Sequence, residues 1–202
     1  FVVLCQRLDR IKEVSAIELN ISCPNIKSHQ PSTLNPQLIS QDPKFTYAVV
    51  SMARGVTKKT LITKLSPNVT SIAEIALAAE EAGTDALSLI NTVTGMSVDI
   101  KTRKPKIASG FAGLSGPAIR PIAVRMVWEA YQKVKVPLIG MGGIMDTESA
   151  LEFIIAGASA VSIGTANFIN PGISIEIING IKEYLKENSI NSIKNLVGSL
   201  KR

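Results

Sequence analysis

The chain has 202 residues, of which 46% are hydrophobic and 19% charged, and it carries a formal net charge of +6. This composition is typical of a globular domain and excludes a disordered chain, while the absence of any apolar run near ~18 residues excludes a membrane span of helical type. Because aromatic residues amount to 4% and the positive residues are scattered along the chain, we expect a solvated basic surface and no nucleic acid partner.

The chain opens inside a predicted amphipathic helix, over residues 1–14, that has no capping residue at its start. We therefore expect further sequence before it. Short and almost continuously apolar segments follow, which are typical of parallel strands buried on both faces. The predicted strands are residues 16–20, 61–65, 86–90, 137–141 and 160–163.

Helices are predicted between these strands from capping residues and apolar spacing. Asp42 and Pro43 form a cap and first-turn pair. The apolar face of the helix that they begin is predicted to comprise Phe45, Ala48, Val49, Met52 and Val56.

The later helices have clearer ends. Ser71 fits a capping box with Glu74, and Gly83 fits the end of that helix. A long apolar stripe over residues 119–134 predicts a further helix. Asp146 caps another that runs to residue 156, and a final amphipathic helix begins near residue 173.

Repeated β–α units predict an α/β fold with a parallel sheet, either an open doubly wound sheet or a (β/α)8 TIM barrel. A barrel typically needs about 250 residues. Five predicted strands after an opening helix agree with about the last five β–α units of such a barrel. We therefore predict a single domain over residues 1–202, the C-terminal part of a barrel, with residues 91–117 as a long functional loop.

Reactive groups of parallel α/β folds lie at the carboxyl ends of the strands. Here each of these ends is polar or glycine-rich: residues 20–25 (NISCPN), 64–68 (KLSPN), 90–92 (INT), 140–143 (GMGG) and 164–165 (GT). The last two follow the last two predicted strands, where a barrel usually binds phosphate. A tight turn would explain either glycine segment alone, but two at neighbouring strands favour a phosphate site.

Other side chains at these ends have a structural and a functional interpretation. Cys23 could act as a general base through its thiolate, whereas Cys5 is expected to be a small buried hydrophobe. Lys64 is either a surface lysine or a charge beside a ligand. The asparagines could bind a planar amide-bearing ligand or form turns; they are Asn20, Asn25, Asn68 and Asn91. The single His29 is expected in a loop, so no metal site is predicted.

Taken together, these segments resemble the catalytic subunit of class 1 dihydroorotate dehydrogenases. The resemblance runs from about residue 16 to the end and is weakest over residues 28–56. Residues 95–105 and 113–121 look most like the NAD-linked subclass 1B. The matching pieces, in order, are residues 18–25 (ELNISCPN), 64–68 (KLSPN), 91–92 (NT), 102–105 (TRKP), 113–119 (GLSGPAI), 140–144 (GMGGI) and 164–165 (GT).

The resemblance implies a cytoplasmic, FMN-bearing (β/α)8 barrel that oxidises dihydroorotate to orotate in pyrimidine biosynthesis. Cys23 would be the base that takes the proton from C5, while a hydride passes from C6 to FMN. The implied FMN contacts are Asn20, Lys64, Ile90, Gly116, Gly142, Gly143, Gly164 and Thr165. The implied pyrimidine contacts are Asn20, Asn25, Asn91 and Thr92.

The resemblance also implies a homodimer and, in subclass 1B, a second electron-transfer subunit that carries FAD and an iron–sulfur cluster. Four thiolates usually hold such a cluster, and this chain has two cysteines. No membrane partner is expected. The final electron acceptor, NAD or fumarate, is not decided by these residues.

Some features depart from the family pattern. The first three β–α units have no counterpart here, residues 28–43 lack the glycines usual in the loop over the substrate, and Ala112 stands where glycine is common. Two alternatives therefore stay open. One is a truncated, non-catalytic barrel, which the missing units favour; the other is a related flavin-dependent reductase of pyrimidines or of dihydrouridine in RNA, which the basic charge permits.

Overall fold

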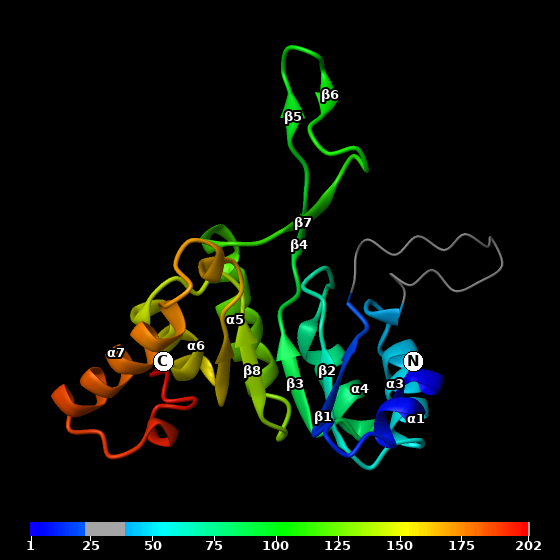
Figure 1. Cartoon of the computed structure of the whole chain (residues 1–202), viewed down its shortest axis with the longest axis horizontal. Coiled ribbons are helices and arrows are strands. Elements are labelled where there is room, and N and C mark those ends of the chain that lie inside the picture. Colours follow the sequence, from blue (N-terminus) through cyan, green and yellow to red (C-terminus); the bar gives the residue numbers. More distant parts are fainter. Residues whose placement is uncertain (23–38, 202) are drawn as a thin grey trace.

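A five-stranded parallel sheet forms the centre of the computed structural model, which describes residues 1–22 and 39–201 (Figure 1). Its strands are β1 (Ala16–Asn20), β2 (Thr60–Lys64), β3 (Ala86–Leu89), β8 (Leu138–Met141) and β9 (Ala160–Ser162), in the spatial order β1-β2-β3-β8-β9. The spatial order follows the chain order without a reversal. A doubly wound sheet reverses its strand order at a switch point, so the order identifies part of a (β/α)8 barrel.

Helices cover one face of the sheet, and four of the described helices connect its strands (Figure 1). The helices are α1 (Val2–Asp9), α3 (Pro43–Arg54), α4 (Ile72–Glu81), α5 (Arg120–Tyr131), α6 (Thr147–Ala156) and α7 (Ile173–Glu187), with short 3₁₀ helices η1 (Pro117–Ile119), η2 (Thr165–Phe168) and η3 (Ile193–Asn195). The core lies between helices and sheet and includes the fully buried Leu61, Leu87, Val127, Leu138 and Phe153.

The prediction that the strands are buried on both faces holds for β3 and is wrong for the other four: β1, β2 and β8 are fully buried on one face only, and β9 has no buried residue. In β1, Ile17 and Leu19 are buried against the helices, whereas Glu18 and Asn20 on the other face are exposed. This second face is the inner face of the sheet, and no strand of the five-stranded sheet lies opposite it. It therefore presents polar side chains to an open interior.

The predicted helix ends are confirmed where a side chain caps the backbone. The Ser71 hydroxyl accepts from the N–H of Glu74 over 3.4 Å at the start of α4. Asp146 and Ser149 form a reciprocal capping box at the start of α6. Gly157 follows α6 with a φ of 128°, a conformation that L side chains rarely adopt.

The predicted apolar face of α3 is displaced. The buried residues are Thr46, Val50 and Ala53, whereas Ala48 is exposed and Met52 is 54% exposed. Thr46 is buried because its hydroxyl donates to the carbonyl of Ile39 over 2.7 Å. A hydroxyl whose hydrogen bond is made can enter the core at little cost. A pattern of apolar residues alone does not identify such a threonine.

The segment predicted as a long loop is an ordered β-arm that projects beyond the sheet (Figure 1). Strand β4 (Val93–Gly95) pairs antiparallel with β7 (Ala112–Leu114), and β5 (Val98–Asp99) pairs antiparallel with β6 (Lys104–Pro105). The Asp99 carboxylate accepts from the N–H groups of Thr102 and Lys101 at the tip, and these bonds hold its pKa below the ordinary value.

Across the described ranges, every helix is too short or too polar to cross a membrane.

Candidate active site

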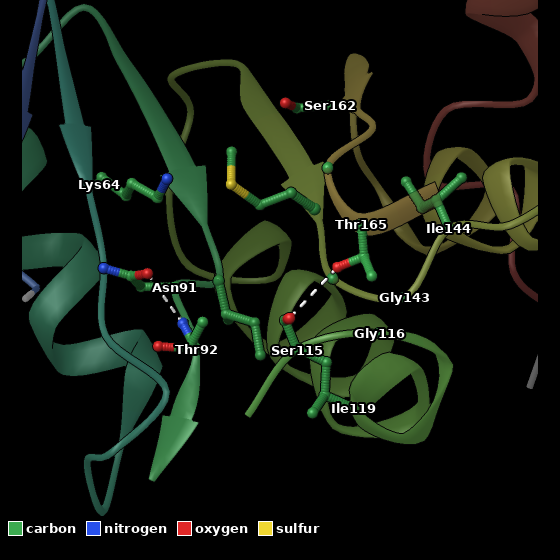
Figure 2. Close-up of a pocket in the computed structure, with 14 residues that line it drawn as sticks. Lys64, Asn91, Thr92, Ser115, Gly116, Ile119, Gly143, Ile144, Ser162 and Thr165 are labelled. Carbon is green, nitrogen blue, oxygen red and sulfur yellow. Dashed lines mark hydrogen bonds between the residues drawn. The ribbon is translucent and has the colours of Figure 1, made fainter. Parts of the chain in front are cut away.

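A cavity of about 210 Å³ opens at the carboxyl ends of β2, β3, β8 and β9 (Figure 2). It brings together most of the residues that the sequence predicted for the site: Lys64, Ile90, Asn91, Thr92, Gly116, Gly142, Gly143, Gly164 and Thr165. These residues come from five separate stretches of chain, so their meeting depends on the parallel order of the strands. The cavity is lined in addition by Ser115, Ile119, Met141, Ile144 and Ser162, which the sequence analysis did not assign.

Lys64, the last residue of β2, directs its nitrogen into this cavity (Figure 2). The ammonium lies 3.9 Å from the Glu18 carboxylate, and the Lys64 side chain is 22% exposed. The described residues supply no hydrogen-bond acceptor to the Lys64 nitrogen. An ammonium has three donors, and none of the three is bonded to a residue within 1–22 or 39–201.

Asn91 links the end of β3 to the end of β1. Its side-chain nitrogen donates to the Ser22 hydroxyl oxygen over 2.9 Å and to the Asn20 side-chain oxygen over 3.4 Å. Its side-chain oxygen accepts from the N–H of Thr92 over 2.9 Å (Figure 2). Asn20 does not line the cavity but is joined to it through Asn91. Ser22, which the sequence analysis left unassigned, is buried and bonds to both Asn20 and Asn91.

The glycine segment after β8 has no room for side chains. Gly143 has a φ of 80°, and a Cβ there would lie 2.7 Å from the carbonyl oxygen of Gly116. At Gly142 the φ is 128° and a Cβ would lie 3.0 Å from that of Ala123. The backbone after β8 is therefore compressed against the start of α5, and only glycine permits it.

The segment after β9 is open by contrast. A Cβ at Gly164 would meet nothing within 4 Å, and the residue lines the cavity. Among the residues that the structure describes, none accepts a backbone hydrogen bond from Gly143, Gly164 or Thr165. The Thr165 hydroxyl donates to the Ser115 hydroxyl oxygen over 3.2 Å (Figure 2). Free N–H groups and hydroxyls around an open space form a donor set that suits a phosphate.

Asn68 has a positioning role rather than a place in the cavity lining. Its side-chain nitrogen donates to the carbonyl of Thr92 over 3.1 Å, and its oxygen accepts from the N–H of Thr94 over 2.9 Å. One amide thus fixes the backbone before and after Val93, where β4 begins the arm. Of the two interpretations of this asparagine, the structure supports the one in which it organises the backbone.

Three predicted residues, Cys23, Asn25 and His29, lie outside the described residues. Cys5 is buried as expected, at 2% exposure. Within residues 1–22 and 39–201, no group of three or more His, Cys, Asp or Glu side chains is placed to hold a metal ion.

The residues missed by sequence reasoning had a detectable signal. Met141 and Ser162 stand in register on β8 and β9, and both line the cavity. Alternation along each strand places Glu18 on the same face as Asn20 and places Ser88 on the face opposite the fully buried Leu87 and Leu89. Steps of two counted back from the predicted strand ends at residues 20, 90 and 141 reach Glu18, Ser88 and Met141 itself, whereas Ser162 is out of step with the predicted end at residue 163.

Comparisons with known proteins agree with this geometry. A sequence model described as dihydroorotate dehydrogenase matches residues 1–185. The chain is 52% identical over 200 residues to the "dihydroorotate dehydrogenase B (NAD(+)), catalytic subunit" of Trichlorobacter lovleyi, covering 99% of this chain and 64% of that protein. It is 51% identical over 197 residues to the protein of the same name in Geotalea uraniireducens, covering 98% of this chain and 63% of that protein. The chain thus spans a little less than two thirds of these relatives.

Among solved structures, the crystal structure of DHODH from Eimeria tenella in complex with ferulenol is similar, with a TM-score of 0.78. The two sequences are 21% identical, and the similarity covers 97% of this chain and 57% of that one. At this identity the likeness supports the fold alone. It confirms the prediction of a partial (β/α)8 barrel.

Proposed function

Because this chain belongs to the dihydroorotate dehydrogenase family, we propose that the whole protein oxidises dihydroorotate to orotate with bound FMN, in pyrimidine biosynthesis in the cytoplasm. The observation that carries the proposal is the convergence of Lys64, Asn91 and the glycine segments on one cavity at the carboxyl edge of the sheet. A barrel enzyme builds its site at this edge.

The residues of the cavity fit FMN at both of its ends. The N–H groups of Gly143, Gly164 and Thr165 would bind the phosphate, because they are free among the described residues and surround open space. The apolar Ile90 and Met141 and the ammonium of Lys64 would face the flavin ring, with Gly116 beside it. Asn20, which is bonded to the cavity residue Asn91, is proposed as a further contact of the ring. When bound, FMN supplies the acceptor for the hydride that leaves C6 of dihydroorotate.

The protein's own residues would orient the substrate and remove its proton. Asn91 and Thr92 line the cavity on the side of β3, and we assign them to the pyrimidine together with Asn20 and Asn25. The amide of Asn91 is already fixed by Ser22 and Thr92, so its orientation costs little on binding. Cys23, three residues beyond the end of β1, is proposed as the base that takes the C5 proton.

We propose that the electrons leave through a second subunit that carries FAD and an iron–sulfur cluster, with NAD as acceptor, and that the catalytic chain forms a homodimer. The relatives are named catalytic subunits of an NAD(+) enzyme, which supports an additional subunit. The β-arm supplies surface for such contacts, since Ile100 at its tip is 87% exposed and Met96, between β4 and β5, is 61% exposed. Single exposed residues are ordinary, but several on one projection are typical of an interface.

A second candidate concerns the 202 residues by themselves. The inner face of β1 is open, and the chain spans 63–64% of its relatives. These observations favour a non-catalytic barrel fragment when this segment stands alone. The reductase alternative has no comparable observation in its favour.

The test is an anaerobic visible spectrum of the full-length protein with FMN, recorded before and after dihydroorotate is added. Bleaching of bound flavin is the expected result. Bound flavin that dihydroorotate fails to bleach would refute the substrate. The same measurement on residues 1–202 alone would decide between the enzyme and the fragment, because the fragment should retain no flavin.

A further inference from the structure

Glu18, Lys64 and Ser88 form a polar group beneath the cavity, on three neighbouring strands. In the register of the sheet, Lys64 stands opposite Asn20 on one side and opposite Ser88 on the other. Glu18 lies one inward-facing position below Asn20 on β1. The Ser88 hydroxyl, which is fully buried, donates to one carboxylate oxygen of Glu18 over 2.8 Å. The other carboxylate oxygen lies 3.9 Å from the Lys64 nitrogen.

This arrangement differs from an ordinary ion pair because Glu18 takes up none of the hydrogen-bond donors of Lys64. At 3.9 Å the carboxylate attracts the ammonium without taking one of its hydrogen bonds. Among the described residues, Glu18 is the one carboxylate paired with Lys64. As far as the described residues go, the ammonium therefore keeps its donors for the cavity, while the Glu18 carboxylate partly neutralises its charge.

We propose that Glu18 is a positioning residue that acts through Lys64: its carboxylate, anchored by Ser88, sits behind the ammonium at the cavity and offsets part of the positive charge that Lys64 brings there. Glu18 itself does not line the cavity. The inference rests on the proposed function, since it concerns the flavin that Lys64 would face.

The expected consequence is a lower affinity of the bound flavin for electrons. Reduction adds negative charge to the flavin ring, and a nearby ammonium stabilises that charge. A carboxylate close behind the ammonium converts a single charge into a pair of opposite charges, whose field decreases faster with distance. The flavin would then pass its electrons on more readily than it would beside an unopposed lysine.

The test replaces Glu18 by Gln in the full-length flavoprotein, which keeps the size and the hydrogen bond to Ser88 but removes the charge. We expect the redox potential of the bound FMN to rise and sulfite, which adds to flavins to give an anionic product, to bind several-fold more tightly. Glu18→Asp retains the charge and should restore values near those of the parent. Glu183→Gln makes the same charge change at an exposed position of α7 and should leave both values unchanged.

An unchanged or lower potential in Glu18→Gln, with unchanged or weaker sulfite binding, would overturn the inference. If Glu18→Gln loses its flavin, Ser88→Ala gives a second measurement, because it releases the carboxylate from its anchor and should shift both values in the same direction by less. A parent protein that binds no flavin, or whose flavin dihydroorotate does not reduce, would overturn the proposed function as well. If dihydroorotate reduces the flavin of the parent normally but Glu18→Gln leaves the redox potential and sulfite binding unchanged, the role of Glu18 alone would be overturned.

Discussion

The side-chain nitrogen of Asn91 donates to the hydroxyl oxygen of Ser22 over 2.9 Å, and this bond ties the end of β3 to the end of β1 across the intervening β2. Ser22 is buried, at 2% exposure, and its hydroxyl donates in turn to the Asn20 side-chain oxygen over 2.9 Å. Two of the proposed pyrimidine contacts, Asn20 and Asn91, thus share one serine. The orientation of the substrate depends on a residue that need not touch it.

Ser22→Ala should therefore weaken orotate binding without loss of flavin. Removal of the hydroxyl leaves the amide of Asn91 with a poorer partner, at a cost of about 1–2 kcal/mol for a buried group. We expect a rise of roughly ten-fold in the Kd for orotate, measured by the change in flavin absorbance on titration. Ser51→Ala removes a hydroxyl at an exposed position of α3, outside the cavity lining, and serves as the control. An equal loss in both variants would show that the bond to Asn91 is not the cause.

Gly143→Ala should remove bound FMN from the full-length protein. A Cβ there would lie 2.7 Å from the carbonyl oxygen of Gly116 and 2.9 Å from Cβ of Arg120, so the loop that would hold the phosphate must move. Gly110→Ala is a matched control, because Gly110 has a similar φ of 87° but nothing within 4 Å of the added carbon. The measurement is the ratio of flavin to protein absorbance after purification. A full complement of flavin in Gly143→Ala would refute the phosphate role.

Much of the fold could be predicted because the strands are short apolar segments bounded by turn residues, and β1 agrees with its prediction over Ala16–Asn20. The arm was missed because its antiparallel strands have two or three residues each, too few to show a period. The Asn91–Ser22 bond joins residues 69 positions apart. Its existence depends on strand register, which no local pattern encodes.

Cys23→Ser should retain FMN but slow its reduction by dihydroorotate. A hydroxyl is a far poorer base than a thiol near neutral pH, and a general base contributes about 10²- to 10⁴-fold to a rate. We expect a loss of at least roughly 100-fold, measured by anaerobic stopped-flow absorbance. Cys5→Ala is the control, since Cys5 is a buried residue of α1 that does not line the cavity. Reduction of Cys23→Ser at the parent rate would exclude this residue as the base.

Asn68→Ala should loosen the base of the arm and raise the KM for dihydroorotate more than it lowers kcat. The variant loses both hydrogen bonds to the backbone at Thr92 and Thr94, and Thr92 is a proposed substrate contact. We expect destabilisation by about 1–2 kcal/mol and a rise of several-fold in KM. Asn68→Asp keeps the acceptor for the Thr94 N–H and should lie between Ala and the parent. If both variants have the parent KM, the clamp does not position the substrate.

The capping box of α6 predicts a pH-dependent contribution to stability. Hydrogen bonds from the side chain and N–H of Ser149 lower the pKa of Asp146 from its ordinary value. A carboxyl group whose pKa is lower in the folded state stabilises the protein above its unfolded pKa, and that stability is lost as the pH falls through the folded pKa. The contribution should thus be complete near neutral pH and decline below about pH 4.

Asp146→Ala should lower the free energy of unfolding by about 1 kcal/mol at pH 7, as for other N-cap residues, and by less in acid. The measurement is a series of denaturant unfolding curves between pH 3 and 7 on the full-length protein. Asp85→Ala is an informative comparison, since Asp85 pairs with Arg54 and lies at a strand start away from α6. A difference between Asp146→Ala and the parent that stays constant down to pH 3 would show that the ionised carboxylate is not the stabilising form. Because the N-cap Asp146 lies three residues after Gly143, a frayed cap should also loosen flavin binding in parallel with the loss of stability.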